Sequence, residues 1–157
     1  MSKSTRATQA LAAAGVTFEV VTYDYDPDAD RIGMQAAEAI GVSASIVLKT
    51  LMAEVDGKAV CVVLPSDREV SMKKLAAAFK GKSANMMKPA VAEKATGYVV
   101  GGISPFGQKK QVPTVFEIEA VAHERVFMNG GQRGLQVRLA PMDAVAAAKA
   151  ITAAIVA

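Results

Sequence analysis

The stretch TGYVVGGISPFGQKK, residues 96–110, could do chemistry with its backbone and without a reactive side chain. Gly102 and Gly107 are separated by four residues, as in a nucleotide-binding P-loop. A P-loop needs Lys directly after the second glycine, but Gln108 follows Gly107 and Pro113 comes soon after. The spacing therefore argues against a nucleotide site. It leaves a glycine loop whose main-chain N–H groups can approach a ligand closely.

Side-chain nucleophiles and metal ligands are scarce, since the chain has one histidine and one cysteine. We expect His123, among the charged neighbours of AVAHERV, to be solvated, and Cys61, within the apolar run AVCVVL, to be buried and structural. The acidic run DYDPDAD begins like a calcium loop, but Ala29 replaces the required glycine and Gln35 the final glutamate. The sequence therefore predicts an exposed acidic turn, no metal, no cofactor and no activated side-chain nucleophile.

Lys49 is the charged residue most in need of an explanation. The Lys-Thr pair interrupts the otherwise apolar run SIVLKTLMAEV, which is typical of a β-strand. Alternate residues of a strand share a face, so Lys49 should point away from Leu48 and Thr50. A cation buried in a central strand needs an anion or a polar cavity. An edge-strand lysine that reaches water is the alternative, and composition does not decide between the two.

The elements that would position these residues alternate between helices and paired strands. The patterns predict helices over 5–14, 34–41 and 71–79, from Pro89 and from about Met142, and strands over 16–23, 45–55, 58–64, 114–120, 125–130 and 135–140. Asp-Gly at 56–57, between two apolar runs, indicates a hairpin. Because hairpins accompany helix-linked strands, we predict an α/β fold of the mixed α+β type, with a mixed sheet.

Composition limits the class of protein. The chain has 157 residues, 52% hydrophobic and 21% charged, which suits one folded domain over 1–157. The net charge of +3 is a mild bias that fits an anionic partner and proves none. No apolar run approaches the length of a membrane span, and the first residues lack the apolar core of a signal peptide. We therefore expect a cytoplasmic protein with no membrane partner.

Four stretches carry a family resemblance: VTYDYDPDADRIGMQAAEAIGV, LKTL, ATGYVVGGISPFGQKKQVPT and MNGGQRGLQVRLAPMD. Together, in this order, they resemble the YbaK family of aminoacyl-tRNA deacylases, and most closely its Cys-tRNA(Pro) deacylase branch. The same fold is an editing insertion in bacterial prolyl-tRNA synthetases. The resemblance implies a mixed, partly barrel-like sheet flanked by helices. It also implies hydrolysis of the ester that joins a mischarged amino acid to tRNA, with the acceptor 3′ end and prolyl-tRNA synthetase as partners.

The resemblance also implies site residues. Lys49 matches the lysine that the family cannot spare, and would hold the terminal phosphate or the developing oxyanion. Gly101 and Gly102 match the GxxxP loop and would place backbone donors near the ester carbonyl, although such a loop can also serve only as a tight turn. The other implied residues are Tyr23, Ile32, Thr50, Ser104, Pro105, Asn129 and Asp143 for substrate binding, and Lys109 and Lys110 for tRNA contact. An acid such as Asp143 in a first helical turn is also commonly just a dipole partner.

The implied mechanism uses the substrate's own thiol, which attacks the ester carbonyl and makes an enzyme nucleophile unnecessary. The substrate would be Cys-tRNA(Pro), with Cys-tRNA(Cys) beside it. Ile32 stands where close relatives tend to carry Phe, and Asn129 where they tend to carry Ser, so Ala-tRNA(Pro) is an alternative substrate. A non-catalytic module that binds tRNA or a synthetase is a second hypothesis. A plain α/β interaction protein is a third, and would leave Lys49 unexplained.

Overall fold

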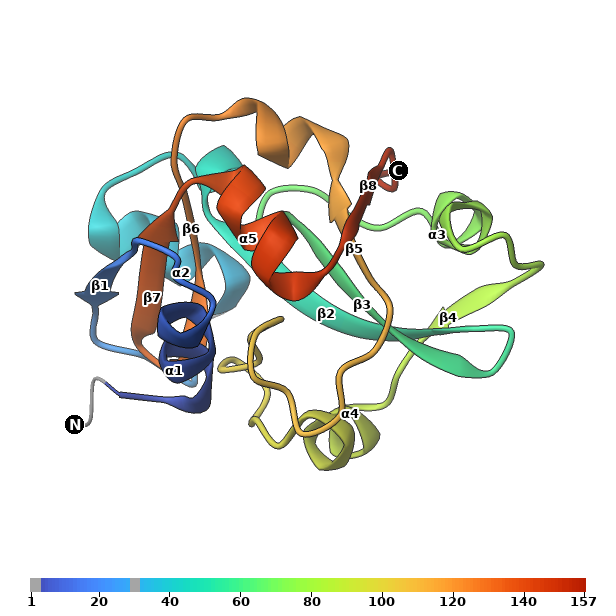
Figure 1. Ribbon diagram of the computed structural model, residues 1–157, viewed down its shortest axis with the longest axis horizontal. Coiled ribbons are helices and arrows are strands. Elements are labelled where there is room, and N and C mark those ends of the chain that lie inside the picture. Colours follow the sequence, from blue (N-terminus) through green and yellow to red (C-terminus); the bar gives the residue numbers. More distant parts are fainter. Residues whose placement is uncertain (1–3, 29–31) are drawn as a thin grey trace.

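Two β-sheets and five α-helices form the part of the chain that the structure, a computed structural model, describes: residues 4–28 and 32–157 (Figure 1). The three-stranded sheet has the strand order β1 (Glu19–Thr22), β7 (Leu135–Leu139), β6 (Val126–Gln132). The five-stranded sheet has the strand order β4 (Ala84–Met86), β2 (Leu48–Val55), β3 (Lys58–Pro65), β5 (Thr114–Glu117), β8 (Ile151–Ala153). Strand β5 pairs in parallel with β3 and β8, and the other pairs are antiparallel. The mixed α+β fold is thus confirmed, but the sheets are not closed as a barrel.

Local sequence signals set the helix ends. The helices are α1 (Arg6–Ala13), α2 (Ile32–Ile40), α3 (Met72–Ala78), α4 (Pro89–Thr96) and α5 (Pro141–Ala148), with short 3-10 helices η1 (Ala44–Ile46) and η2 (Ile118–Ala122). The side chains of Thr5 and Ser71 accept backbone N–H groups in the first turns of α1 and α3, as N-caps do. Proline begins both α4 and α5. No helix within the described ranges has the length and apolar character needed to span a membrane.

The β2–β3 hairpin forms as predicted. Its two-residue turn, Asp56–Gly57, has φ of +50° and +79°, the positive values that a tight hairpin turn requires. The side chains of β2 alternate between two apolar clusters, because Met52 packs into one cluster and Leu51 into the other. The predicted placement of Lys49 and Thr50 on opposite faces of β2 follows from this alternation.

On the side away from β3, β2 is an open sheet edge between Val47, which bridges Phe127 of β6, and Met52. Strand β4 pairs with β2 only at Ala53–Val55, and Met87 N–H then donates to the Met52 carbonyl at 3.1 Å before the chain enters α4. Alternate residues of an antiparallel strand turn their backbone groups to the same edge, so the N–H and C=O of Thr50 face the same side as the Met52 carbonyl. Although β2 is second in its sheet, Lys49 therefore lies on an edge segment.

Three predicted strand boundaries were wrong by three residues. The strand expected over 114–120 ends at Glu117, because the chain turns into η2 there, and the strand expected over 16–23 begins only at Glu19. The strand expected over 45–55 begins only at Leu48, because η1 precedes it. Strands β4 and β8 were not predicted at all. Both have three residues and include alanine or asparagine, so neither carries a strong β-propensity signal. Tertiary pairing with β2 and β5 defines them instead.

The predicted acidic turn is exposed where the structure describes it. Asp24, Asp26 and Asp28 are exposed, and the side chain of Gln35 bonds the backbone N–H and C=O of Asp26 at 2.8 and 2.9 Å. Gln35, which replaces the final calcium ligand, thus holds the turn closed. Ala29, the other mismatch to a calcium loop, lies outside the described residues.

Glu117 ties the C-terminal segment to the five-stranded sheet. Its side chain is buried, and Oε1 accepts the N–H groups of Ile155 and Val156 at 2.8 and 3.3 Å. Oε2 accepts the N–H of Glu119 at 2.8 Å. One carboxylate therefore serves three backbone donors.

We expect Glu117→Ala to lower the free energy of unfolding by about 2–4 kcal/mol, because these donors lose their acceptor in a buried site. Urea denaturation measures the change. The matched control is Glu119→Ala, which removes an exposed ion pair with Arg68 and should cost no more than about 1 kcal/mol. Equal losses for the two variants would contradict this role of Glu117.

Candidate functional site

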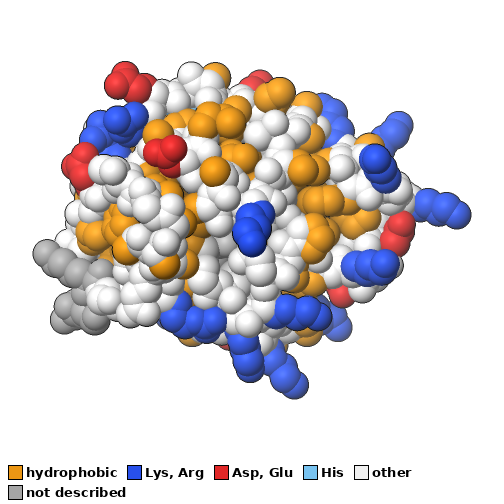
Figure 2. All heavy atoms as spheres, in the orientation of Figure 1, with side chains coloured by type: hydrophobic (Ala, Val, Ile, Leu, Met, Phe, Trp, Pro, Cys, Tyr) orange, Lys and Arg blue, Asp and Glu red, His pale blue; other side chains and the backbone are white. Residues whose placement is uncertain are grey.

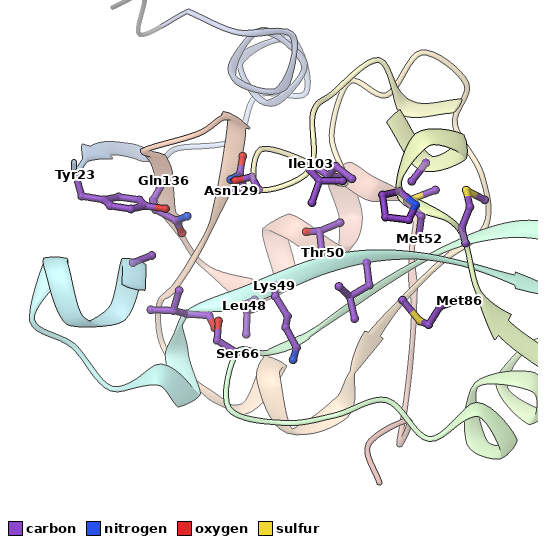
Figure 3. Close-up of a pocket in the computed structure, with 18 residues that line it drawn as sticks. Tyr23, Leu48, Lys49, Thr50, Met52, Ser66, Met86, Ile103, Asn129 and Gln136 are labelled. Atoms are coloured by element: carbon purple, nitrogen blue, oxygen red, sulfur yellow. The ribbon is translucent and has the colours of Figure 1, made fainter. Parts of the chain in front are cut away.

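A cavity of about 380 Å³ lies where the open half of β2 meets β6, β7, α4 and the glycine loop (Figure 3). Its wall is mostly apolar, and Met52 and Met86 lie at one end. Tyr23 and Gln136 lie at the opposite end, and Thr50 and Asn129 lie between the two ends (Figure 3). Ligand sites in proteins are typically such apolar cavities with a few polar groups. This cavity is therefore the candidate site.

Lys49 is the single charged side chain among the described residues that line the cavity. Its side chain is 19% exposed, and its Nζ lies 3.7 Å from Oε1 of Glu69, whose side chain is 86% exposed. A pair with so exposed a partner contributes little stability. The ammonium group is therefore held loosely by the protein and can approach an anionic ligand group.

Thr50 leaves β2 on the side opposite to Lys49, and both line the cavity (Figure 3). The cavity thus wraps around the open edge of β2. The hydroxyl oxygen of Thr50 is buried and has no hydrogen-bond partner within the described ranges. A buried polar atom without a partner is uncommon in folded proteins. The hydroxyl is therefore available to a ligand.

The two glycines predicted as catalytic have different positions. Gly101 lines the cavity, has φ of +91°, and its N–H takes part in no hydrogen bond among the described residues. Gly102 does not line the cavity, and its N–H donates to the Val99 carbonyl at 2.8 Å. A side chain at Gly102 would meet the backbone of Gln132 and Arg133 at 3.0–3.3 Å. Gly102 thus allows close packing, and Gly101 offers the free donor.

The β6–β7 hairpin holds the glycine loop in place. Asn129 Nδ2 donates to the Gly101 carbonyl at 2.8 Å, while its Oδ1 accepts the N–H groups of Gly131 and Gln132 at 2.7 and 3.2 Å. Arg133 Nε donates to the Val100 carbonyl at 2.9 Å. Asn129, predicted to bind substrate, lines the cavity and holds the Gly101 carbonyl, whereas Arg133 holds the carbonyl of the Val100–Gly101 peptide, which carries the Gly101 N–H.

Ser104 and Pro105, both predicted to bind substrate, are buried but do not line the cavity. The hydroxyl of Ser104 accepts the N–H of Phe106 at 3.1 Å, and its carbonyl accepts Nε2 of Gln108 at 3.0 Å. Tyr98 closes the same loop by donating to the Phe106 carbonyl. The structure therefore places Ser104 and Pro105 behind the cavity wall, where they shape the loop.

The remaining predicted residues divide between the cavity and other surfaces. Tyr23 lines the cavity, and burial, followed by the nearby Tyr25, raises the pKa of its hydroxyl. Asp143 is exposed on α5 and lines a separate hollow beside the end of α1, so the structure does not bring it to the cavity. Lys109 and Lys110 are exposed after the glycine loop. Ile32 begins α2, and its side chain lies outside the described part of the chain.

Sequence reasoning missed Gln136, which is buried on the cavity wall. In the strand LQVRL the alternation of apolar and polar residues predicts that Gln136 and Arg138 face solvent. Arg138 does pair with the exposed Glu19, but the cavity end covers Gln136. Ser66 was also missed; it lines the cavity and donates to the Val47 carbonyl at 2.6 Å. Neither residue carries a local signal that could have revealed its role.

The two side chains that could act as nucleophile or base lie away from the cavity. Cys61 is fully buried, as predicted, and burial raises the pKa of its thiol to about 12. His123 is half-buried in a separate hollow that contains Arg125 and Arg138. Neither residue lines the cavity around Lys49. The cavity can therefore supply a cation, a backbone N–H and hydroxyl groups.

We expect Gly101→Ala to lower kcat/KM for any reaction at this cavity by about tenfold to a hundredfold, because a mispositioned backbone donor loses much of its effect. The residue has φ of +91°, and a Cβ there would lie 2.5 Å from the hydroxyl of Tyr25. Gly15→Ala is the matched control, since Gly15 has φ of +75° and a Cβ there would meet no atom within 4 Å. Both variants should lose stability through backbone strain, and only Gly101→Ala should lose activity. An equal loss of activity in both would contradict a role for Gly101 in the cavity.

Comparisons with known proteins show the family and the fold of the chain. The family model of the aminoacyl-tRNA editing domain matches residues 26–147. A protein of Enterococcus faecalis whose name proposes a Cys-tRNA(Pro)/Cys-tRNA(Cys) deacylase, EbsC, is 36% identical over 122 residues, 76% of this chain and 74% of that protein. A proline–tRNA ligase of Streptomyces coelicolor is 49% identical over 53 residues, 34% of this chain and 9% of the ligase. A crystal structure described as a proposed trans-editing enzyme for prolyl-tRNA synthetase has the same fold, with a TM-score of 0.84 and 22% identity over 97% of this chain and 95% of that chain.

Proposed function

The chain belongs to the aminoacyl-tRNA editing domain family and is an aminoacyl-tRNA deacylase, and from this premise we propose that its substrate is Cys-tRNA(Pro), with Cys-tRNA(Cys) as a second substrate. The name of the Enterococcus faecalis relative supports this choice of amino acid. Cysteine is close in size to proline, and an apolar activation pocket rejects such a near-isostere poorly, so a second site has to remove it. Deacylation of the mischarged tRNA in the cytoplasm would meet this need.

The observation that carries the proposal is the composition of the cavity wall. Lys49 and Gly101 line it, and the Gly101 N–H has no partner among the described residues, whereas Cys61 and His123 do not line the cavity. An ester can be cleaved at such a site if the substrate brings its own nucleophile and the protein supplies orientation and charge stabilisation. The thiol of cysteine is such a nucleophile.

The proposed reaction proceeds in two steps. The substrate sulfur attacks the ester carbonyl, a sulfur–carbon bond forms, and the bond from the carbonyl carbon to the tRNA 3′ oxygen breaks. The thiol proton leaves to solvent and the 3′ oxygen takes up a proton, so the tRNA departs with a free hydroxyl. Water then opens the cyclic thioester to give free cysteine. Gly101 N–H would bind the developing oxyanion, and Lys49 would bind the neighbouring phosphate or share the oxyanion charge.

Ala-tRNA(Pro) is the second candidate substrate, and one observation favours it. Asn129 stands where relatives of the cysteine branch tend to carry Ser, and its amide donates to the Gly101 carbonyl at 2.8 Å. A change at this cavity-lining position would alter the wall next to the ester and would suit attack by water in place of the substrate thiol. Alanine brings no nucleophile, so its removal would require that water.

The test is a deacylation assay with Cys-, Ala- and Pro-charged tRNA(Pro) and with Cys-charged tRNA(Cys). We expect rapid loss of cysteine from both tRNAs and no measurable loss of proline. Rapid loss of alanine with slow loss of cysteine would replace the proposal by the second candidate.

An exposed basic surface supports tRNA as the partner. From Val70 to Phe116 the chain has eight lysines and one acid, Glu93, and all eight lysines are exposed. Figure 2 shows Lys and Arg side chains along the right and lower margins of one face, where Figure 1 places α3, β4 and α4. The cavity opens beside β4 and α4. Phosphates of the acceptor end could cross this surface. Because the net charge is only +3, tRNA affinity should be modest, and prolyl-tRNA synthetase could add selectivity as a partner.

We expect the double variant Lys109→Ala/Lys110→Ala to raise KM for charged tRNA by about tenfold without changing the saturated rate. Removing a phosphate contact should also lower the salt dependence of log KM, by about one unit of slope for each contact. Arg125→Ala is the control, because Arg125 is exposed outside the lysine-rich segment and bonds the carbonyl of Glu124. Unchanged KM and salt slope in the lysine variant would exclude Lys109 and Lys110 from tRNA binding.

A further inference from the structure

The Tyr23 end of the cavity contains a polar group that the proposed reaction does not use. Gln136 is 4% exposed, and its Oε1 is buried with no hydrogen-bond partner among the described residues. It lies directly across the β6–β7 ladder from Asn129, whose side chain donates to the Gly101 carbonyl. Opposite residues of an antiparallel pair have neighbouring side chains, so Gln136 lies within reach of a ligand held at Gly101.

A buried amide oxygen without a partner calls for a hydrogen-bond donor. Folded proteins rarely leave such an acceptor unsatisfied, and at a cavity wall the missing donor is commonly a ligand group. Tyr23 lines the same end of the cavity, and the Gln136 side chain partly offsets the rise that burial causes in the pKa of the Tyr23 hydroxyl. Gln136 therefore presents a free acceptor beside the ring of Tyr23.

The donor at this end should be neutral. No Asp or Glu is among the described residues that line the cavity, and Lys49 already contributes a positive charge. A protonated amine would be desolvated there without a carboxylate to balance it. A neutral amine on a planar ring fits better, because an amide side chain pairs with the amine and ring nitrogen of adenine, and aromatic rings such as that of Tyr23 stack on unpaired bases.

The order of groups along the cavity agrees with a nucleotide at this end. Tyr23 and Gln136 lie at one end, Lys49, Thr50 and Asn129 in the middle, and Met52 and Met86 towards the other end (Figure 3). In an aminoacylated 3′ terminus the ester likewise lies between the terminal nucleoside and the amino-acid side chain. A small apolar side chain suits the methionine end, and the base then falls at the polar end.

We propose that Gln136 and Tyr23 form a subsite for the adenine base of the tRNA 3′-terminal nucleotide, in which Gln136 Oε1 accepts a hydrogen bond from the 6-amino group. The subsite rests on the proposed deacylase function, because it assumes an aminoacyl-adenosine in the cavity. Every tRNA ends in the same nucleotide, so this subsite would anchor the 3′ end without distinguishing between tRNAs. Selectivity among tRNAs would then depend on surfaces outside the cavity.

The experiment uses cysteinyl minihelices that end in adenosine or in purine riboside, which lacks only the 6-amino group. Wild-type protein and Gln136→Leu are compared for kcat/KM of deacylation and for binding of the same minihelices uncharged. We expect wild type to lose about tenfold or more on removal of the amino group, as for one base contact. With the adenosine minihelix, Gln136→Leu should already show the same loss relative to wild type. Replacing adenosine by purine riboside should then lower its values no further. Gln9→Leu, at an exposed glutamine on α1, should behave as wild type.

Two results would overturn the subsite. Equal values for both minihelices with wild type would show that the 6-amino group is not bound. If the losses from Gln136→Leu and from removal of the 6-amino group were independent and additive, Gln136 would contact another part of the substrate. Gln136→Glu, which keeps an acceptor, checks that a loss in Gln136→Leu does not reflect misfolding, since it should retain part of the preference for adenosine. If wild type binds the minihelices but does not release cysteine, the proposed function fails while the binding comparison still tests the subsite.

Discussion

Lys49→Ala is expected to lower kcat/KM for Cys-tRNA(Pro) by at least about a hundredfold, because it removes the cation that would hold the neighbouring phosphate or share the developing oxyanion charge. Lys49 is the single charged side chain among the described cavity residues, so no neighbour in this set can replace it. The melting temperature should hardly change. The partner of Lys49 is the largely exposed Glu69 at 3.7 Å, and such pairs contribute little to stability.

Three variants accompany this measurement. Glu69→Ala removes the partner of Lys49 and should leave most of the activity, because Glu69 is outside the cavity lining. Cys61→Ala and His123→Ala should also retain most activity, since neither residue reaches the cavity. Full activity of Lys49→Ala with a normal melting curve would remove Lys49 from the mechanism. A loss above about a hundredfold in Cys61→Ala or His123→Ala, with the fold intact, would instead favour side-chain nucleophile or general-base catalysis.

Much of the fold could be predicted because its signals are local. The Asp56–Gly57 turn fixes the β2–β3 hairpin, and hairpin geometry fixes which face of β2 each residue takes. Thr5, Ser71 and the prolines that begin α4 and α5 mark helix starts through backbone groups within one turn. The placement of the Lys49 and Thr50 side chains on opposite faces of β2 could be predicted directly from this local information.

The rest depends on contacts between distant segments. Strand β4 pairs with one edge of β2 only at Ala53–Val55, and nothing in the sequence around Lys49 indicates where β4 stops. Gly101 and Gly102 are adjacent and of one type, but the Val99 carbonyl takes the N–H of Gly102 alone. Gln136 alternates in its strand like a solvent-facing residue until the cavity end covers it. Sequence patterns predict which residues share a face, whereas the site depends on what lies opposite that face.

The thiol of the substrate is expected to have an effect as large as that of Lys49. Cysteine and serine differ in one atom, and an apolar pocket discriminates between such groups by only about 1–3 kcal/mol. The thiol has a pKa near 8.5 and is partly ionised at neutral pH, whereas a hydroxyl is not. If the side chain of the substrate attacks its own ester, cysteine should therefore be released far faster than serine, and alanine should be released slowly as well.

The central claim, that the protein orients the substrate and the substrate supplies the nucleophile, is tested most directly by single-turnover deacylation at saturating protein. Saturation removes differences in binding, so the rates of Cys-, Ser- and Ala-tRNA(Pro) compare the chemical step alone. We predict that the rate for cysteine exceeds those for serine and alanine by more than about 200-fold, beyond the discrimination expected of a pocket. Equal rates for the three would contradict the account and indicate attack by water, with Asn129 and Gly101 as the first residues to test.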